Sequence, residues 1–254
     1  MLFFKIIFLR FLVGSILLFG NHAWAQKVSM VTTQWEPFYS SNLPAEGVIT
    51  EVAKAAFQRE NHQASVSWYP WMRALKIAAY GEADVVMGAY YSEERSKKFY
   101  YSDPIFSIDV GLIALKSLGI VSYEKLDNLK PYKIGVMRGW VYTQEFDQAD
   151  FLDKHTLSNQ VTAVRMLLAK RVNIIAASIP VFQHEISLLK SELAADTVVL
   201  KPLLESKPLY LMFNRVDEGN EKLLADFNRG LAKIRADGTF DKILDKHGFK
   251  NFNR

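Results

Sequence analysis

The chain has 254 residues, of which 50% are hydrophobic and 23% charged, with a formal net charge of +4 and no cysteine. This composition is typical of a folded chain rather than a disordered one. The lack of cysteine excludes cysteine nucleophiles, cysteine-ligated zinc and iron–sulfur clusters. Because the charge is small and lysine and arginine form no dense run, we do not expect nucleic acid as a partner.

The first 25 residues have the pattern of a secretory signal peptide. Lys5 and Arg10 give a basic start, residues 11–19 are almost wholly apolar, and Ala-Trp-Ala at 23–25 is a small-residue cleavage site. The apolar stretch is short for a membrane span, so an uncleaved anchor is the less favoured interpretation, and a lipid anchor would need a cysteine. We expect export to the periplasm and cleavage after Ala25, which leaves 254 − 25 = 229 residues.

Strands and helices are predicted to alternate after the leader. Apolar residues recur along one face of the first helix, Pro70 ends the second strand, and Gly81 follows the second helix where helices often end. The order strand–helix–strand–helix–strand implies right-handed crossovers and a parallel sheet. The predicted strands are 27–33, 64–69 and 83–89, and the predicted helices are 48–59 and 72–80.

A similar pattern restarts after a further strand at 110–115, and it ends in a helical tail. The chain is therefore predicted to form two similar α/β lobes in succession. The later predicted strands are 132–137, 172–178, 198–203 and 209–214, and the later helices are 142–152, 161–170, 179–193, a helix from 221, and 240–247.

Five short segments after the leader stand in a characteristic order. They are the aromatic loop 35–39, the strand 81–88, the stretch 92–104 with Ser-Glu-Glu-Arg and Tyr-Ser-Asp-Pro, the strand 133–139, and Asp-Gly-Thr-Phe-Asp-Lys-Ile at 237–243. Together they resemble the bacterial periplasmic solute-binding proteins of the polar amino acid type (family 3), which are the receptors of ABC importers. The resemblance covers nearly all of the chain after the leader.

The resemblance implies the two-lobed α/β fold of type II periplasmic binding proteins. Each lobe would be a central sheet flanked by helices, with lobe one formed by 26–112 plus 209–254 and lobe two by 113–208. Two hinge strands, near 112–116 and 209–213, would join them. The ligand would bind in the cleft as the lobes close around it.

Arg95 is the first candidate for ligand contact, since the resemblance implies that the residue at this position binds a ligand carboxylate. A guanidinium fits that role, because its planar fork matches a carboxylate with two hydrogen bonds. The alternative is a surface ion pair with Glu93 or Glu94.

Aromatic residues cluster in the first loop and before the second helix. We expect Tyr39 and Trp71 to be ligand walls, which aromatic rings provide at low entropic cost, and Phe38 and Trp68 to pack in the core. Arg73 is either a second cation in the cleft or an exposed helix residue. The resemblance also implies ligand hydrogen bonds at Gly88 and Tyr90.

Two departures from the family pattern bear on the ligand. Arg138, Gly139 and Trp140 stand where the family usually has Gly-Thr at a carboxylate contact. Ser178 stands where an aspartate commonly holds the ligand's ammonium group, so either Glu36 supplies that charge or the ligand lacks the ammonium. Ser178 has another interpretation, as N-cap of the helix entered through Pro180.

We therefore expect a non-catalytic, monomeric periplasmic protein that captures a small carboxylate-bearing solute, an amino acid or a related organic acid, and delivers it to an ABC permease. One alternative is an enzyme on the same fold that acts on a cyclic carboxylic acid, as cyclohexadienyl dehydratases do, and another is a sensory receptor without transport. No catalytic residue, metal or cofactor is predicted, because the histidines lie in unrelated contexts. A cleft with several arginines and no acid would favour anionic ligands.

Overall fold

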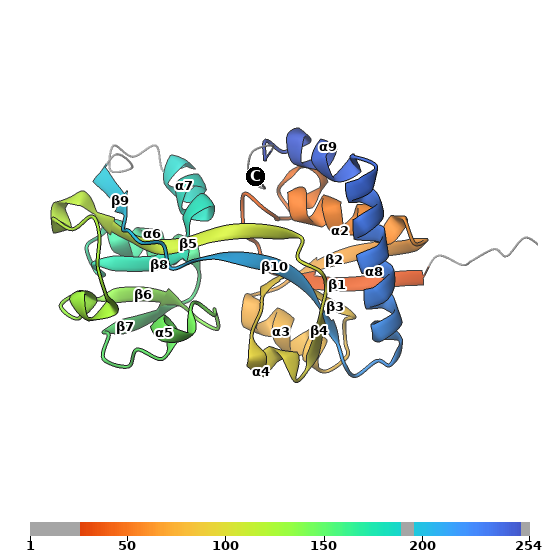
Figure 1. The fold of residues 1–254 in the computed structure, drawn as a ribbon, viewed down its shortest axis with the longest axis horizontal. Helices are drawn as coiled ribbons and strands as arrows, with labels where there is room; N and C mark the ends of the chain where they lie inside the picture. Colours follow the sequence, from red (N-terminus) through yellow and green to blue (C-terminus); the bar gives the residue numbers. More distant parts are fainter. Residues whose placement is uncertain (1–25, 189–195, 250–254) are drawn as a thin grey trace, which may run out of the picture.

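A computed structural model describes residues 26–188 and 196–249, which form two lobes joined by a pair of long strands (Figure 1). The predicted signal peptide lies outside the described residues, so its cleavage stays a prediction. No helix within the described ranges has the length and apolar character that crossing a membrane requires.

The first lobe contains the chain's N-terminal strands and its last two helices. Strand β1 pairs in parallel with both β2 and β3, as the alternating pattern predicts. Its strands are β1 (Gln26–Thr32), β2 (His62–Trp68), β3 (Val85–Tyr90) and β4 (Phe99–Tyr101), and its helices are α2 (Val48–Gln58), α3 (Trp71–Ala79), α4 (Glu93–Ser96), α8 (Gly219–Ala236) and α9 (Thr239–Lys246).

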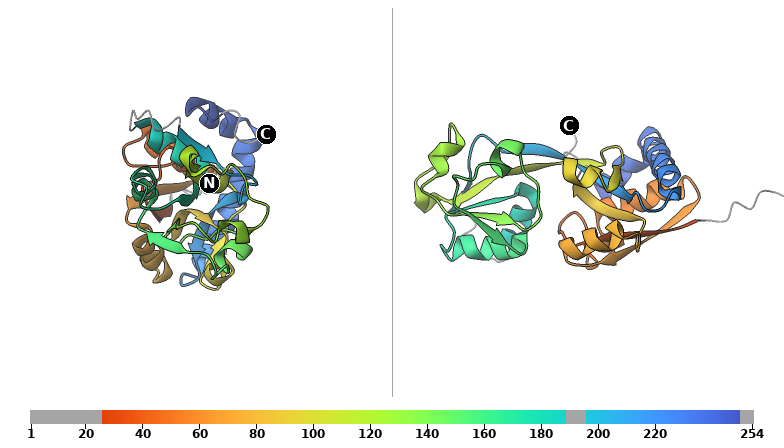
Figure 2. Two further views of the ribbon diagram at one scale, coloured as in Figure 1. Left: turned by 90° about the vertical axis from the view of Figure 1, so that its left-hand side faces the viewer. Right: turned by 90° about the horizontal axis from the view of Figure 1, so that it is seen from below.

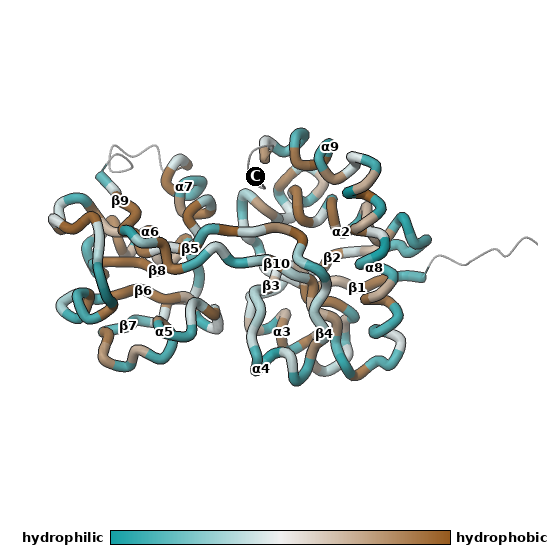
Figure 3. Tube along the Cα trace, viewed as in Figure 1, coloured by the Kyte–Doolittle hydropathy of each residue, from teal (hydrophilic) through white to brown (hydrophobic). Residues whose placement is uncertain are grey.

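The second lobe repeats the alternation on a smaller scale. Strand β6 pairs in parallel with β7 and β8, and hydrophobic residues run along β6 and β8 (Figure 3). Its strands are β6 (Ile134–Met137), β7 (Lys154–Leu157), β8 (Ile174–Ser178) and β9 (Thr197–Val199), and its helices are α5 (Gln144–Asp147), α6 (Gln160–Leu168) and α7 (Ile179–Leu188). Short 3-10 turns are η2 (Pro44–Glu46), η3 (Lys116–Leu118) and η4 (Leu126–Leu129).

Two antiparallel strands, β5 (Phe106–Leu115) and β10 (Glu205–Asn214), run between the lobes (Figures 1 and 2). They pair with each other over 106–110 and 205–209. Beyond that stretch β5 pairs with β8 of lobe two, and β10 pairs with β3 of lobe one. The strand order is therefore continuous, β2-β1-β3-β10-β5-β8-β6-β7. The lobe boundaries expected after 112 and before 209 stay a prediction.

Most predicted elements lie within a few residues of the observed ones, and two are clearly shorter. The helix expected over 142–152 is only α5, and the strand expected over 198–203 is only β9. The helix expected over 179–193 is observed as α7 to Leu188, and the rest of its range lies outside the described residues. Strands β4 and β7 and helix α4, of three or four residues each, have no counterpart in the prediction.

Helices cover both faces of the lobe-one sheet, with α2, α8 and α9 on one side and α3 and α4 on the other (Figure 1). The two sides form separate hydrophobic clusters. Helices α2 and α8 pack very closely, because a Cβ added at Gly230 would lie 2.0 Å from the carbonyl oxygen of Ala56. Glycine at that point allows the two backbones to approach.

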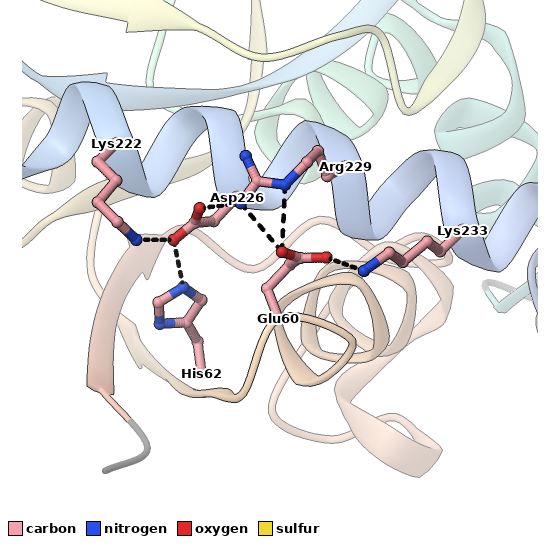
Figure 4. Close-up of polar contacts among 6 residues, drawn as sticks. All are labelled: Glu60, His62, Lys222, Asp226, Arg229 and Lys233. Carbon is pink, nitrogen blue, oxygen red and sulfur yellow. Dashed lines mark hydrogen bonds and ion pairs between the residues drawn. The ribbon is translucent and has the colours of Figure 1, made fainter. Parts of the chain in front are cut away.

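A polar network ties α8 to the start of β2 and the turn after α2 (Figure 4), and α8 lies on the side of lobe one away from lobe two (Figure 1). Asp226 is buried and lies 2.9 Å from His62 Nε2 and 2.7 Å from Lys222 Nζ, and it also pairs with Arg229. Glu60 accepts from Arg229 at 3.0 Å and from Lys233 at 2.6 Å. The network fixes α8 on the sheet without contributing a group to the space between the lobes.

Candidate ligand-binding cleft

A small pocket lies between the lobes where β3 ends and the loop after β6 begins. Its volume is about 30 Å³, which is about the share of one water molecule in the liquid. Lobe one supplies most of the wall, and lobe two supplies the residues after Gly139. We call it the inner pocket, and its lining residues are Thr33, Trp35, Tyr39, Trp71, Gly88, Tyr90, Arg95, Trp140 and Val141.

Arg95 reaches this pocket from the short helix α4. The hydroxyl of Ser92 accepts a hydrogen bond from the Arg95 backbone N–H and caps the helix. The half-buried guanidinium donates to the carbonyl oxygen of Tyr90 at 3.2 Å and to that of Gly139, in lobe two, at 2.5 Å. It also lies 5.5 Å from the ring of Trp71. Burial lowers the pKa of Arg95 below its ordinary value, yet a guanidinium stays charged at neutral pH.

Tyr39 and Gly88 form the floor of the inner pocket. Tyr39 is 2% exposed, and its hydroxyl donates to the carbonyl oxygen of Gly88 at 3.1 Å. Burial raises the pKa of Tyr39 well above its ordinary value. Phe38 is fully buried, as expected, and Trp68 is half-buried, packing against the same hydrophobic core while also lining the space between the lobes.

Trp140, which belongs to lobe two, packs among aromatic side chains of lobe one. Its ring stands edge-on to Trp35 at 5.6 Å and to Tyr90 at 6.1 Å. Two buried polar atoms of this group, Trp35 Nε1 and the hydroxyl of Tyr90, have no hydrogen-bond partner within the described part of the chain. The lobes therefore meet through an aromatic contact beside Arg95.

A larger space, which we call the outer cavity, opens from the same region with a volume of about 790 Å³. It is lined by aromatic rings, amides and three charged side chains, a mixture typical of small-molecule sites. Its lining residues are Thr33, Gln34, Trp35, Glu36, Trp68, Tyr69, Pro70, Trp71, Arg138, Trp140, Ser158, Asn159, Gln160, Val161, Val181, Glu185 and Leu188.

Two acids lie in the outer cavity rather than in the inner pocket. The hydroxyl of Ser40 donates to Glu36 at 2.7 Å, and His184 of lobe two lies 3.3 Å from the other Glu36 oxygen. The bond from Ser40 lowers the pKa of Glu36, burial opposes this, and His184 adds to the lowering. Burial raises the pKa of Glu185, with His184 opposing the rise and the charge of Glu36 adding to it. Glu36, the acid considered as a substitute for the missing aspartate, therefore lies in the outer cavity together with Glu185.

Three sequence candidates lie apart from the inner pocket. Arg73 is exposed on α3 and lies 5.1 Å from the ring of Tyr69, and Arg138 lines the outer cavity. Ser178 is fully buried at the end of β8 and lines neither space. Its hydroxyl has no hydrogen-bond partner among the residues described, so the N-cap interpretation is wrong. The remaining candidates, except Glu36, meet around Arg95.

The sequence model of the bacterial extracellular solute-binding proteins, family 3, matches residues 28–251. The chain belongs to this family. That membership agrees with the two lobes, the two joining strands and the cleft between them. Within the described ranges, no three histidine, cysteine, aspartate or glutamate side chains group as they would around a metal ion.

Proteins of known name are similar to this chain over most of its length. The lysine/arginine/ornithine-binding periplasmic protein of Escherichia coli K12 is 24% identical over 232 residues, which is 85% of this chain and 84% of that protein. A histidine kinase sensor domain similar to periplasmic binding proteins superposes with a TM-score of 0.76 at 17% identity, covering 89% of this chain and 97% of that one. An amino acid ABC transporter substrate-binding protein from Streptococcus pneumoniae, bound to L-arginine, gives 0.71 at 18% identity, covering 90% and 97%.

Several lining residues of this solute-binding protein were missed at the level of sequence. Asn159 caps α6, because its side chain accepts a hydrogen bond from Thr162 N–H, and the Asn-Gln pair before the predicted helix was a usable signal for Gln160. Gln160 is buried and donates to the carbonyl oxygen of Ser178 at 2.8 Å. Glu185 and His184 carried no signal, since only the packing of the lobes brings α7 to Glu36.

Proposed function

We propose that the protein captures a small carboxylate-bearing solute between its lobes, with Arg95 binding the carboxylate, and delivers it to an ABC importer. The observation that carries the proposal is the guanidinium itself. It is half-buried in the inner pocket and, within the described ranges, forms no salt bridge, having only two carbonyl oxygens as acceptors. A carboxylate is a better acceptor for a guanidinium than a carbonyl is, because the hydrogen bond becomes charge-assisted on both sides.

Binding of this kind requires an exchange at Arg95. The carbonyl oxygen of Gly139 would give way to a ligand carboxylate, while the bond to Tyr90 keeps the guanidinium in place. The similarity to periplasmic proteins whose names include amino acids supports a solute of this class and a periplasmic location, and the Ala-Trp-Ala pattern supports a leader removed after Ala25. We propose a monomer that works by binding and not by catalysis, without a cofactor.

Calorimetry with Arg95→Ala tests the carboxylate contact. Loss of a charge-assisted contact in a closed cleft should weaken carboxylate binding by about 2–5 kcal/mol, while the circular dichroism spectrum stays native. Arg73→Ala, an exposed arginine outside both spaces, is the matched control and should bind normally. An unchanged affinity in Arg95→Ala would remove Arg95 from the site.

Two further measurements separate the proposed function from its alternatives. Mass spectrometry should recover a bound carboxylate unchanged after incubation, whereas a new product would indicate an enzyme. Deleting the gene in its host should abolish uptake of the ligand if the partner is an ABC importer. Normal uptake with a changed signalling output would indicate a sensory receptor.

A further inference from the structure

The segment Gly139–Trp140 of lobe two fills the lobe-one pocket with a carbonyl oxygen and a flat ring. Two donors converge on the Gly139 oxygen, since Arg95 Nη2 lies at 2.5 Å and Trp71 Nε1 at 3.4 Å. A pair of donors aimed at one oxygen, one of them cationic, is the arrangement that a carboxylate oxygen would use.

The ring of Trp140 follows directly and stands among aromatic neighbours. Trp35 and Tyr90 meet it edge-on, at interplanar angles of 87° and 88°, and Tyr142 of its own lobe lies 6.3 Å away. Edge-to-face contacts of this kind favour an aromatic ring over an aliphatic chain of similar size. With Trp140 in place the inner pocket keeps only about 30 Å³, so a ligand ring that enters the inner pocket itself, between Trp35 and Tyr90, must displace Trp140.

The charge of the inner pocket argues against an ammonium group next to the carboxylate. Among the described residues that line it, Arg95 is the one that carries a charge, and none is an acid. The acids Glu36 and Glu185 line the outer cavity instead, and Glu205 is already paired with Lys207 at 2.9 Å. An α-ammonium held beside Arg95 would therefore be desolvated without a carboxylate partner, which is costly.

We infer that the ligand is an aromatic carboxylate without an α-ammonium group, and that Gly139–Trp140 is its internal competitor. This inference rests on the proposed function. The ligand carboxylate takes the place of the Gly139 oxygen on Arg95 and Trp71, and the ligand ring takes the place of Trp140 between Trp35 and Tyr90. The apparent affinity is then lower than the intrinsic affinity, because only the molecules in which Trp140 has left the pocket can bind the ligand.

Matched ligand pairs test the chemistry by calorimetry on the full mature chain. 3-Phenylpropionate and L-phenylalanine differ only in the α-ammonium group, as do indole-3-propionate and L-tryptophan. The ammonium-free member of each pair should bind at least about tenfold more tightly, since a tenfold ratio corresponds to one unsatisfied polar interaction of modest size. Equal or tighter binding of the amino acids would overturn the inference.

Substitutions at Trp140 test the competition. Trp140→Ala should bind 3-phenylpropionate more tightly than wild type, by about tenfold if Trp140 occupies the pocket in nine molecules of ten, and Trp140→Phe should give a smaller gain. Thermal unfolding checks that both variants fold. Weaker binding in both would make Trp140 a wall of the site and overturn the competitor role.

Arg95→Ala in the same titrations shows whether a failure concerns only this inference or also the proposed function. If hexanoate or an amino acid binds through Arg95 and no aromatic acid does, the inference fails and the proposed function stands. If no carboxylate binds, or if Arg95→Ala leaves the affinity unchanged, both fail.

Discussion

The hydroxyl of Tyr39 donates a hydrogen bond to the carbonyl oxygen of Gly88 at 3.1 Å, so the first loop of lobe one is fastened to the end of β3. Gly88 has φ +81°, and a Cβ added there would lie 2.4 Å from that hydroxyl. Only glycine allows both the backbone turn and the close approach of the tyrosine ring. Arg95 and Tyr90 follow within seven residues, so this fastening positions the inner pocket.

Gly88→Ala should destabilise the protein and weaken ligand binding together. The positive φ costs about 1–2 kcal/mol for a residue with a side chain, and the displaced Tyr39 ring adds about 1–3 kcal/mol. Urea unfolding measures the loss. Gly119→Ala is the matched control, because Gly119 has φ +78° with no atom within 4 Å of the added Cβ. Equal losses in the two variants would contradict the role given to Tyr39.

Asp226→Asn should remove an acid-sensitive part of the folding stability. Burial would raise the pKa of Asp226, but hydrogen bonds from Lys222, His62 and Arg229 outweigh it and lower the pKa to about 2. Because the folded pKa lies below the unfolded value of about 3.9, the stabilisation is complete above pH 4 and is lost as the pH falls from about 4 to 2. It amounts to about 2 kcal/mol by linkage.

Urea unfolding at several pH values between 6 and 2 tests this prediction. The difference in unfolding free energy between wild type and Asp226→Asn should shrink as the pH falls through that range. Glu221→Gln, an exposed residue of the same helix, should show a small and constant difference. A constant difference for Asp226→Asn would show that its network carries no charge-dependent stability.

The sequence predicted the lobes well because periodicity reports burial within one element. Helix α2 buries Val52, Ala56 and Phe57 along one face, as its apolar spacing indicates. The helix expected over 142–152 is short for a tertiary reason. Tyr142 donates to the carbonyl oxygen of Ala176 at 3.1 Å, and it accepts from Met137 N–H. These two hydrogen bonds hold Tyr142 in the core of lobe two, so the helix begins after it, at Gln144.

The site was predictable only in part, because half of it depends on how the lobes meet. Arg95 and Gly88 belong to segments whose motifs the sequence carries, and both line the inner pocket. Trp140 was identified as a departure from the family pattern, but its contact with Trp35 joins residues 105 positions apart and leaves no local trace. Arg73 was a candidate for the cleft because it follows Trp71 by two residues in the sequence. In a helix, residues two apart point in different directions, so Arg73 is exposed while Trp71 lines the inner pocket.

Glu36→Gln should leave the affinity for a carboxylate bound at Arg95 within about twofold, because Glu36 lines the outer cavity and not the inner pocket. Its carboxylate is already held by Ser40 and His184, so removing the charge costs stability more than binding. Calorimetry with 3-phenylpropionate measures the affinity. A loss of tenfold or more would place Glu36 against the ligand, as a substitute for the acid that Ser178 replaces.

Polar contacts across the cleft should hold the lobes together in solution. The Gly139 oxygen accepts hydrogen bonds from the guanidinium of Arg95 and from Trp71 Nε1. His184 lies 3.3 Å from Glu36. Arg95→Ala should increase the radius of gyration in small-angle scattering, because the two strands that join the lobes permit rigid-body opening. His184→Ala should give a smaller increase, since a partly exposed ion pair contributes about 0–1 kcal/mol.

Arg73→Ala controls for the loss of an arginine near the cleft mouth and should scatter as wild type does. A carboxylate that takes the place of the Gly139 oxygen should also change the wild-type curve, whereas in Arg95→Ala the same ligand should have no effect. Superimposable curves for wild type and Arg95→Ala would mean that the aromatic contact of Trp140 holds the lobes without help from the guanidinium. In that case Trp140→Ala, and not Arg95→Ala, should open them.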